Sequence, residues 1–370
     1  MNWRDKPVIL LGGGVRAAGV DPSRLLDLGV PVVATWGAVD LVNNWHPNYF
    51  GSIGVYGQRA ANKVFYNARH IVAIGARLSA WTIGHAGLLP EQHLTMVDCD
   101  HREAARHKGS EWYGDIELFV NGLKSPYDEE WMWQCNKWAA AHPLIEDAHD
   151  DKNNYINSYK AMAWLSGQLK DDAQIVVDTG AFMCPVFQAM RFKPPQRVYI
   201  SGAVGEMGSA LPGAVGVSFA RDKGEVLCLV GDGGFMLNMQ ELATIRYHKL
   251  PVKIIVFDND GYGMIRGTFG TVKRQKLGVD RESGLGFPDF AKLAASFGIS
   301  ACNVSTWDAF KNWSEVMFKH PGPFLMQLQI DPEQEYVPRL KPILKDGVIT
   351  PPRFDQLSPI PNPFPENEGT

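Results

Sequence analysis

The chain has 370 residues, of which 45% are hydrophobic and 21% are charged. This length and composition are those of a soluble globular protein that buries a large core and divides most naturally into two domains. A net charge of -4 excludes the strongly basic surface with which proteins bind nucleic acid or anionic lipid.

The cysteines and the apolar segments restrict the cellular setting. Cys99, Cys135, Cys184, Cys228 and Cys302 occur singly, without a C-x-x-C pair, so we expect neither a zinc site nor a disulfide framework. No segment reaches the roughly 18 apolar residues of a membrane span, and Met1 to Leu11 does not have the pattern of a signal peptide. We therefore expect a cytoplasmic protein without a membrane partner.

Residues 1–124 alternate short apolar runs with helix-length segments. The runs are Val8–Leu11, Val30–Ala34, His70–Gly75 and Leu94–Asp98. Such runs are typical of buried parallel strands, so this region is predicted to form a doubly wound α/β domain with a mostly parallel sheet. Gly12-Gly13-Gly14 lacks the G-x-G-x-x-G spacing of a dinucleotide site, which favours a tight turn.

The remainder is predicted to contain a linker, a second α/β domain and a tail. Residues 125–157 form the linker, with a helix around Glu129–Ala141 that lays its tryptophans against neighbouring surface. Residues 158–335 form a second doubly wound domain with strands at Gln174–Val177, Val226–Val230, Lys253–Phe257 and Pro323–Gln329, and helices at 158–169, 239–248 and 287–297. Residues 336–370 are rich in proline and form an extended tail.

Two strands of the second domain end in oxygen-bearing side chains and glycine. Gly231-Asp232-Gly233-Gly234 follows the first strand, and Asn259-Asp260-Gly261 follows the next. Because parallel strands end at one sheet edge, the Asp232 carboxylate, the Asn259 amide and the Gly261 carbonyl can converge on Mg²⁺. Gly233 and Gly234 let backbone N–H groups approach a diphosphate, and Asn238 lies within reach. Gly-Asp-Gly alone is more often a β-turn, so the prediction depends on Asn259, 27 positions after Asp232.

This Gly-Asp-Gly…Asn pattern resembles the thiamine diphosphate enzymes. Residues 231–266, with Gln240-Glu241-Leu242-Ala243-Thr244 inside them, and the stretch Ser201–Pro212 look like the acetohydroxyacid synthase large-subunit family. The resemblance implies thiamine diphosphate and Mg²⁺ as cofactors. It gives Met207 the family's role of an apolar wedge that holds the cofactor bent. A methionine usually fills the core, so this assignment depends on the match alone.

Further cofactor contacts follow from the same resemblance. Those on the pyrimidine side are Thr179, Gly180 and Ala181, within the stretch Asp178–Phe182; those on the thiazolium side are Tyr262, Gly263 and Met264; the diphosphate contacts are Gly231, Gly233, Gly234 and Asn238; and the metal ligands are Asp232, Asn259 and Gly261.

The first domain resembles the central domain of that family. Gly57–Asn62, Gly75–Ser79 and Val97–Asp100 match it in order. Ala80-Trp81-Thr82 stands where FAD-binding members have an arginine-rich stretch, so FAD is not expected. Trp81 also stands at the position of an arginine that grips a 2-keto acid carboxylate, and Arg266-Gly267-Thr268 replaces a tryptophan. We therefore expect another C–C bond cleavage or ligation rather than acetolactate synthesis.

The resemblance covers the central and diphosphate-binding domains and not the family's pyrimidine-binding domain. The glutamate that activates the cofactor has no counterpart here. We therefore expect the diphosphate-binding subunit of a split lyase or transferase, active on a 2-keto acid or ketone, in a hetero-oligomer such as α2β2 with a pyrimidine-binding subunit. The alternative is a catalytically silent thiamine diphosphate-binding or regulatory protein.

Overall fold

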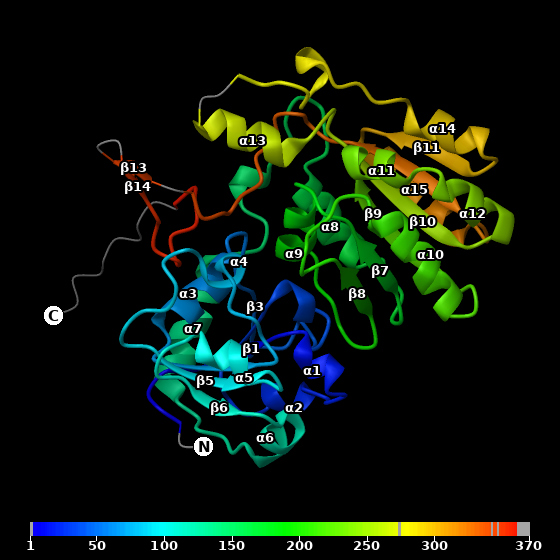
Figure 1. Ribbon diagram of the computed structural model, residues 1–370. Coiled ribbons are helices and arrows are strands. Elements are labelled where there is room, and N and C mark those ends of the chain that lie inside the picture. Colours follow the sequence, from blue (N-terminus) through cyan, green and yellow to red (C-terminus); the bar gives the residue numbers. More distant parts are fainter. Residues whose placement is uncertain (1–2, 273–274, 342, 346–347, 361–370) are drawn as a thin grey trace. The chain divides into compact units, whose positions relative to one another are not determined.

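The chain divides into two compact units, each described here by itself (Figure 1). The computed structural model describes residues 3–272, 275–341, 343–345 and 348–360. Unit 1 comprises Met1–Glu146, Arg191–Lys193 and Val337–Thr370; unit 2 comprises Asp147–Met190 and Pro194–Tyr336. Each unit contains a six-stranded parallel sheet with flanking helices, which confirms the predicted fold class of two doubly wound α/β domains.

The sheet of unit 1 has the strand order β3-β2-β1-β4-β5-β6, and every neighbouring pair is parallel. Its strands are β1 (Pro7–Leu11), β2 (Val32–Ala34), β3 (Tyr49–Ser52), β4 (His70–Ile74), β5 (His93–Val97) and β6 (Glu111–Tyr113). The four predicted strands are therefore confirmed. The two edge strands, β3 and β6, were not predicted.

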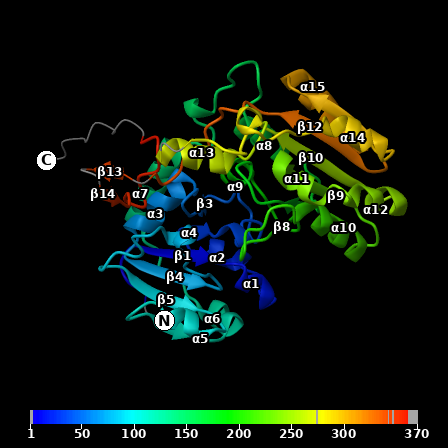
Figure 2. The same cartoon turned by 45° about the horizontal axis from the view of Figure 1, so that its top comes forward.

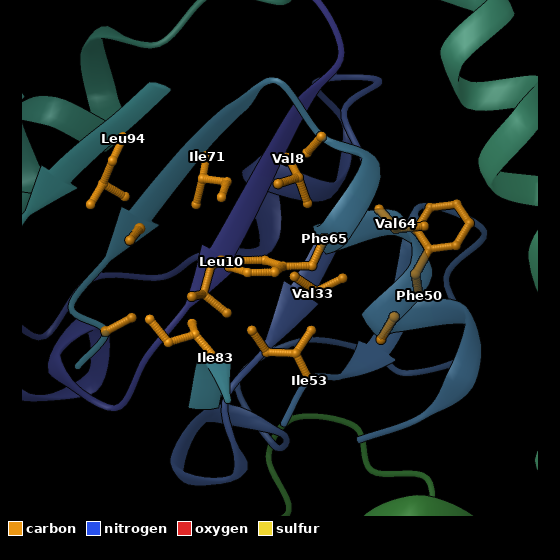
Figure 3. Packing of buried hydrophobic residues seen from close by; sticks show 14 of the residues in the cluster. Val8, Leu10, Val33, Phe50, Ile53, Val64, Phe65, Ile71, Ile83 and Leu94 are labelled. Carbon is orange, nitrogen blue, oxygen red and sulfur yellow. The ribbon is translucent and has the colours of Figure 1, made fainter. Parts of the chain in front are cut away.

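Apolar side chains fill both faces of this sheet. Val8 and Leu10 of β1 lie on the face that is covered by α3 (Arg59–Asn67) and α7 (Glu129–Ala141). Figure 3 shows them in one cluster with Val64 and Phe65 of α3. Ile9 and Leu11 point to the other face, toward α2 (Ser23–Leu26) and α6 (Ile116–Gly122). Alternation along one strand thus builds two cores, because successive side chains point to opposite faces.

The helix predicted within the linker packs on unit 1. Trp131 of α7 is buried and its Nε1 donates to Pro7 O at 2.8 Å; Trp138 packs beside it, whereas Trp133 is 61% exposed. Part of the segment assigned to the tail also joins unit 1: Phe354 is buried in the core, and its carbonyl accepts from Asn62 Nδ2 at 3.0 Å. The boundaries proposed from the sequence stay a prediction.

The sheet of unit 2 has the order β11-β12-β10-β9-β7-β8 and is also parallel throughout. Its strands are β7 (Gln174–Val177), β8 (Arg197–Ile200), β9 (Val226–Gly231), β10 (Val252–Asp258), β11 (Ser300–Val304) and β12 (Phe324–Gln329). The chain passes from β7 out to β8 and then back across β7 to β9. The strand order therefore reverses between β7 and β9, the position where open α/β sheets bind ligands.

Helices cover both faces of the second sheet (Figure 2). One face packs against α10 (Ala210–Ala220), α12 (Glu241–His248) and α14 (Phe290–Ser296). The other described helices of this unit are α8 (Ser158–Ser166), α9 (Met183–Ala189), α11 (Asp232–Asn238), α13 (Gly263–Val272), α15 (Trp307–Lys319) and the short 3-10 helices η2 (Asp147–His149) and η3 (Arg281–Ser283). In unit 1, the remaining described elements are α1 (Gly14–Ala17), the 3-10 helix η1 (Trp36–Ala38), α4 (Ala80–Ile83), α5 (His101–Ala105) and the antiparallel strands β13 (Ile343–Lys345) and β14 (Val348–Thr350). None of the helices in the described ranges has the length and apolarity needed to cross a membrane.

Candidate functional site

A pocket opens in unit 2 at the carboxyl edge of its sheet. It lies around the point where the strand order reverses, and its walls come from segments that follow β7, β8, β9, β10 and β12. Thirteen of the predicted site residues line it: Thr179, Gly180, Ala181, Met207, Gly231, Asp232, Gly233, Gly234, Asn259, Gly261, Tyr262, Gly263 and Met264. Asn238 is outside this lining. Phe182, Phe257, Ile265 and Tyr336 complete the wall. The roles assigned to these residues stay predictions.

Strand register brings the two polar strand ends together. β9 and β10 are parallel neighbours in which Gly231 pairs with Phe257, so Asp232 and Asp258 follow at the same level. The backbone N–H of Asn259 donates to Asp232 Oδ2 at 3.1 Å, and the N–H of Gly261 donates to the same oxygen at 2.9 Å. The Asp232 carboxylate thus holds the loop that carries the other two candidate ligands.

Asp232 is a buried carboxylate without a cationic partner among the described residues. Its Oδ1 accepts from Gly233 N at 2.6 Å, and only 3% of the residue is exposed. Burial raises the pKa of Asp232 to about 7, against the opposing effect of its N–H donors. A divalent cation at this position would supply the missing positive charge.

The amide of Asn259 can be oriented in two ways, and each suits a different state of the site. In one orientation, Oδ1 lies 2.8 Å from Gly261 O and 3.2 Å from Asp232 Oδ2, while Nδ2 donates to the Tyr336 hydroxyl at 3.2 Å. Oδ1 then faces two other oxygens with no proton between them. Rotating the amide replaces Oδ1 by Nδ2, which donates to both oxygens.

The first orientation fits a bound cation. Octahedral Mg²⁺ with Mg–O distances of about 2.0–2.1 Å places neighbouring ligand oxygens roughly 3 Å apart, close to the separations of 2.8 and 3.2 Å found here. The second orientation suits the metal-free protein, because every polar atom then has a partner. The residues present therefore fit Mg²⁺, with one carboxylate, one amide and one carbonyl as ligands.

Glycines are required where the pocket wall is closest to the backbone. A Cβ on Gly233 would lie 2.3 Å from the Tyr262 ring and 3.2 Å from Met207 Cε, and one on Gly263 would lie 2.6 Å from Asn259 Nδ2. Any side chain at these positions would fill the pocket or push its wall aside. The space beside Gly233 is occupied by Tyr262 and Met207, which explains why this position carries no side chain. The contact of Gly233 and Gly234 with a diphosphate stays a prediction.

The loop that carries Met207 is tied down from two sides. Asp178 accepts from Gly208 N at 2.9 Å and from Ser209 N at 3.0 Å, and Asn238 Nδ2 donates to Gly208 O at 2.7 Å. Asp178 and Asn238, which the sequence analysis had grouped with the cofactor contacts, bind this loop in the structure. Burial raises the pKa of Asp178, whereas its N–H donors lower it.

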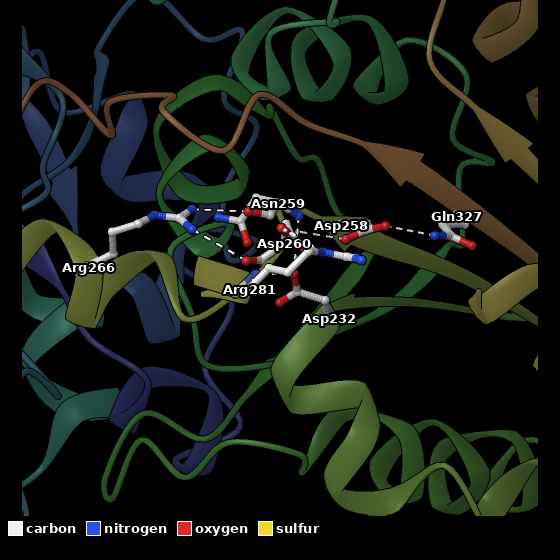
Figure 4. A network of polar contacts seen from close by, with 8 residues as sticks. Asp232, Asp258, Asn259, Asp260, Arg266, Arg281 and Gln327 are labelled. Atoms are coloured by element: carbon white, nitrogen blue, oxygen red, sulfur yellow. Dashed lines mark hydrogen bonds and ion pairs between the residues drawn. The ribbon is translucent and has the colours of Figure 1, made fainter. Parts of the chain in front are cut away.

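Two further residues of the site were missed by the sequence analysis. Tyr336, placed in the predicted tail, is buried and bonds to Asn259 through its hydroxyl. Arg266, noted only as a departure from the family pattern, is 8% exposed and donates through Nη2 to Asn259 O at 3.0 Å (Figure 4). Neither contact has a sequence signal, because both depend on the course of the chain beyond the motif.

In the described part of the chain, no three His, Cys, Asp or Glu side chains lie close enough together to bind one metal ion. The predicted site is compatible with this, since only one of its three proposed ligands is an acidic side chain.

Two regions of the chain match domain models of the thiamine pyrophosphate enzymes. The thiamine pyrophosphate enzyme central-domain model matches residues 1–123, and the thiamine pyrophosphate enzyme C-terminal TPP-binding domain model matches residues 178–328. The chain is 28% identical to the acetolactate synthase isozyme 2 large subunit and 27% identical to the isozyme 1 large subunit of Escherichia coli, over 91% and 92% of this chain. It is 28% identical to a probable acetolactate synthase large subunit of Methanocaldococcus jannaschii over 96% of this chain.

The alignments cover only part of the relatives. They span 62% and 61% of the two Escherichia coli proteins and 64% of the Methanocaldococcus jannaschii protein. The likeness therefore extends to two domains of these proteins, and it confirms the resemblance stated from the sequence.

Proposed function

Because the chain belongs to the thiamine pyrophosphate enzymes, with their central and C-terminal domains, we propose that it is the diphosphate- and Mg²⁺-binding subunit of an enzyme that cleaves or forms C–C bonds. A separate subunit would bind the pyrimidine end of the cofactor. The observation that carries this proposal is the convergence of the Asp232 carboxylate, the Asn259 amide and the Gly261 carbonyl at the carboxyl edge of the second sheet.

The chain's own residues would hold the polar end of the cofactor. The Asp232 carboxylate, the Asn259 amide oxygen and the Gly261 carbonyl would hold the cation, which would supply positive charge to the diphosphate. Gly233 and Gly234 lie buried in the first turn of α11, where backbone N–H groups have no partner within the helix and would be available to a diphosphate if the contact of Gly233 N with Asp232 Oδ1 were exchanged. Met207, held by the contacts of Asp178 and Asn238 with the following residues, would supply an apolar contact to the bound cofactor.

Thiamine diphosphate supplies the carbon nucleophile that attacks a substrate carbonyl. Within the pocket lining, Asp232 is the only carboxylate among the described residues, and it is committed to the cation and the ligand loop. A second carboxylate, able to bond the pyrimidine ring, must therefore come from outside this lining. This requirement supports a pyrimidine-binding partner and a hetero-oligomer such as α2β2.

The proposed substrate is a 2-keto acid or a related ketone, in the cytoplasm. Apolar groups, including Phe182, Met264 and Ile265, make up much of the wall, which suits a substrate carbonyl reacting away from water. Trp81 stands at the position of the family's carboxylate-gripping arginine and is 58% exposed. An indole cannot make a charge-assisted pair, so the proposal is a reaction other than acetolactate synthesis.

The metal assignment is tested by Asp232→Ala, with Asp260→Asn as the matched control. Asp260 is an aspartate of the same loop whose carboxylate contacts the exposed Arg281 at 3.2 Å. Removing Asp232 removes a ligand and three N–H contacts, so Mg²⁺-dependent binding of thiamine diphosphate, measured by calorimetry, should fall more than about 100-fold, since a buried charged contact is worth roughly 3 kcal/mol. The control should stay within about threefold of wild type.

Retained affinity in Asp232→Ala would refute the metal site. The split-enzyme part of the proposal is tested separately, by co-purification with a pyrimidine-domain partner and by assay of the complex. Turnover by this chain alone would contradict the need for a partner. Cofactor binding without turnover, even with the partner present, would favour a catalytically silent binding protein.

A further inference from the structure

We propose that Arg266 is a positioning residue that fixes the loop Asn259–Gly261 in the form that binds the cation. This inference rests on the proposed function, because it assigns Arg266 a role toward the Mg²⁺ site described above. The guanidinium donates through Nη2 to Asn259 O at 3.0 Å and through Nη1 to Asp260 O at the longer distance of 3.5 Å.

The loop needs such support because its backbone is strained. Asp260 has φ of 55° and Gly261 has φ of 145°. The first value lies in the left-handed region, which is unfavourable for a residue with a side chain, and the second is accessible to glycine. Strained conformations of this kind persist only where the surrounding contacts impose them.

Two oppositely charged side chains hold the backbone of this loop, one at its N–H groups and one at its carbonyls. The anionic Asp232 accepts from the N–H groups of Asn259 and Gly261, and the cationic Arg266 donates to the carbonyls of Asn259 and Asp260 (Figure 4). The third carbonyl, Gly261 O, accepts from Gly263 N at 3.0 Å and faces the Asn259 side-chain amide, whose nearer atom lies 2.8 Å away. The same amide atom lies 3.2 Å from Asp232 Oδ2. Arg266 thus decides which carbonyl of the loop is presented to the cation.

Arg266 is suited to this task by burial and by shape. It is 8% exposed and forms no ion pair with any residue in the described ranges. A guanidinium keeps its charge when buried and therefore needs acceptors. Its planar fork can reach two neighbouring carbonyls at once, which the single ammonium of lysine does less well.

Arg281 provides a matched control on the same loop. It approaches Asp260 from solvent, with a side chain that is 71% exposed, and it contacts the carboxylate rather than the backbone. The two arginines therefore differ in burial and in the group they bind, while both place a positive charge beside Asp260.

The test measures Mn²⁺ affinity of the full chain in the presence of saturating thiamine diphosphate, from the paramagnetic resonance signal of free Mn²⁺. The variants are Arg266→Met, Arg266→Lys and Arg281→Met, each checked for folding by circular dichroism. We expect Mn²⁺ affinity to fall about tenfold in Arg266→Met, the effect of losing one charged hydrogen bond. It should fall about threefold in Arg266→Lys and stay within about twofold in Arg281→Met.

Wild-type Mn²⁺ affinity in a folded Arg266→Met protein would overturn the positioning role. So would an equal loss in Arg281→Met, since any nearby positive charge would then suffice. If Arg266→Met does not fold, Arg266→Lys decides: wild-type affinity in that variant overturns the role, and a reproducible loss supports it. A wild-type chain that binds no Mn²⁺ at all would instead overturn the proposed function.

Discussion

Gly234 is the residue at which the architecture of the site leaves least room. A Cβ there would lie 2.0 Å from Asp178 Oδ2, the carboxylate oxygen that accepts from Gly208 N at 2.9 Å. Asp178 can therefore reach the Met207 loop only because position 234 has no side chain. The second glycine after Asp232 thus serves the neighbouring loop as well as the pocket.

Gly234→Ala should destabilise the protein by about 2–4 kcal/mol, because the buried Asp178 carboxylate would lose its hydrogen bonds or the helix would shift. Gly216→Ala is the matched control: Gly216 lies in α10, is exposed, and has no heavy atom within 4 Å of the place that a Cβ would take. That variant should be stabilised by about 0.5–1 kcal/mol, through helix propensity. Urea unfolding measures both; a neutral Gly234→Ala would contradict the close approach.

Some residues of the site could be predicted from the sequence, and others could not. The positions of Asp232 and Asn259 were predictable, because the ends of adjacent parallel strands must meet at one edge. Tyr336 and Arg266 were not, because each reaches Asn259 from outside the two strand ends. Asn238 lies close to the motif in sequence, and it was therefore expected to reach the diphosphate. In the structure its amide donates to Gly208 O, a contact that depends on how the Met207 loop folds.

At the scale of strands, the sequence predicted the centre of each sheet and missed its edges. The central strands β1, β4, β9 and β10 are continuous apolar runs because helices cover both their faces. The unpredicted strands β3, β6, β8 and β11 are all edge strands. β6 is exposed along its whole length, and β11 (Ser-Ala-Cys-Asn-Val) contains two polar residues and is only partly buried, so neither strand has the continuous apolar run of a buried strand.

The first residues of β4 and β5 place two histidines side by side. His70 pairs in register with His93, is fully buried, and contacts Thr95 Oγ1 through Nε2 at 2.9 Å. Burial, with smaller contributions from His93 and Arg4, lowers the pKa of His70 to about 4. The folded protein therefore keeps this ring neutral at pH values where the unfolded chain binds a proton.

This difference predicts acid sensitivity of unit 1. In the unfolded chain the pKa of a histidine is about 6.5, so stability contributed by neutral His70 is complete above pH 6.5 and is lost as the pH falls toward 4. The loss should reach about 3 kcal/mol. His70→Gln should flatten the dependence of the free energy of unfolding on pH between 6.5 and 4, whereas exchanging the exposed His85 for Gln should not. A wild-type slope in His70→Gln would contradict this assignment.

At the scale of the whole molecule, the pocket residues and the acid-sensitive histidine belong to different units. Every residue of the pocket lining lies in unit 2, and His70 lies in unit 1. A ligand that binds only the folded state stabilises the part of the structure that forms its site. We therefore expect the cofactor to raise the stability of unit 2 and acid pH to lower the stability of unit 1.

Hydrogen exchange measures this difference strand by strand. With thiamine diphosphate and Mg²⁺ at about 100 times the dissociation constant, stabilisation of about 2.7 kcal/mol should slow exchange of the most protected amides in β9 and β10 by about 100-fold. Amides of β1 and β4 should change much less, because their unit contributes no residue to the pocket lining. The effect should vanish in Asp232→Ala. Equal protection of both sheets would show that the two units unfold as one, and protection confined to β1 and β4 would place the cofactor in the wrong unit.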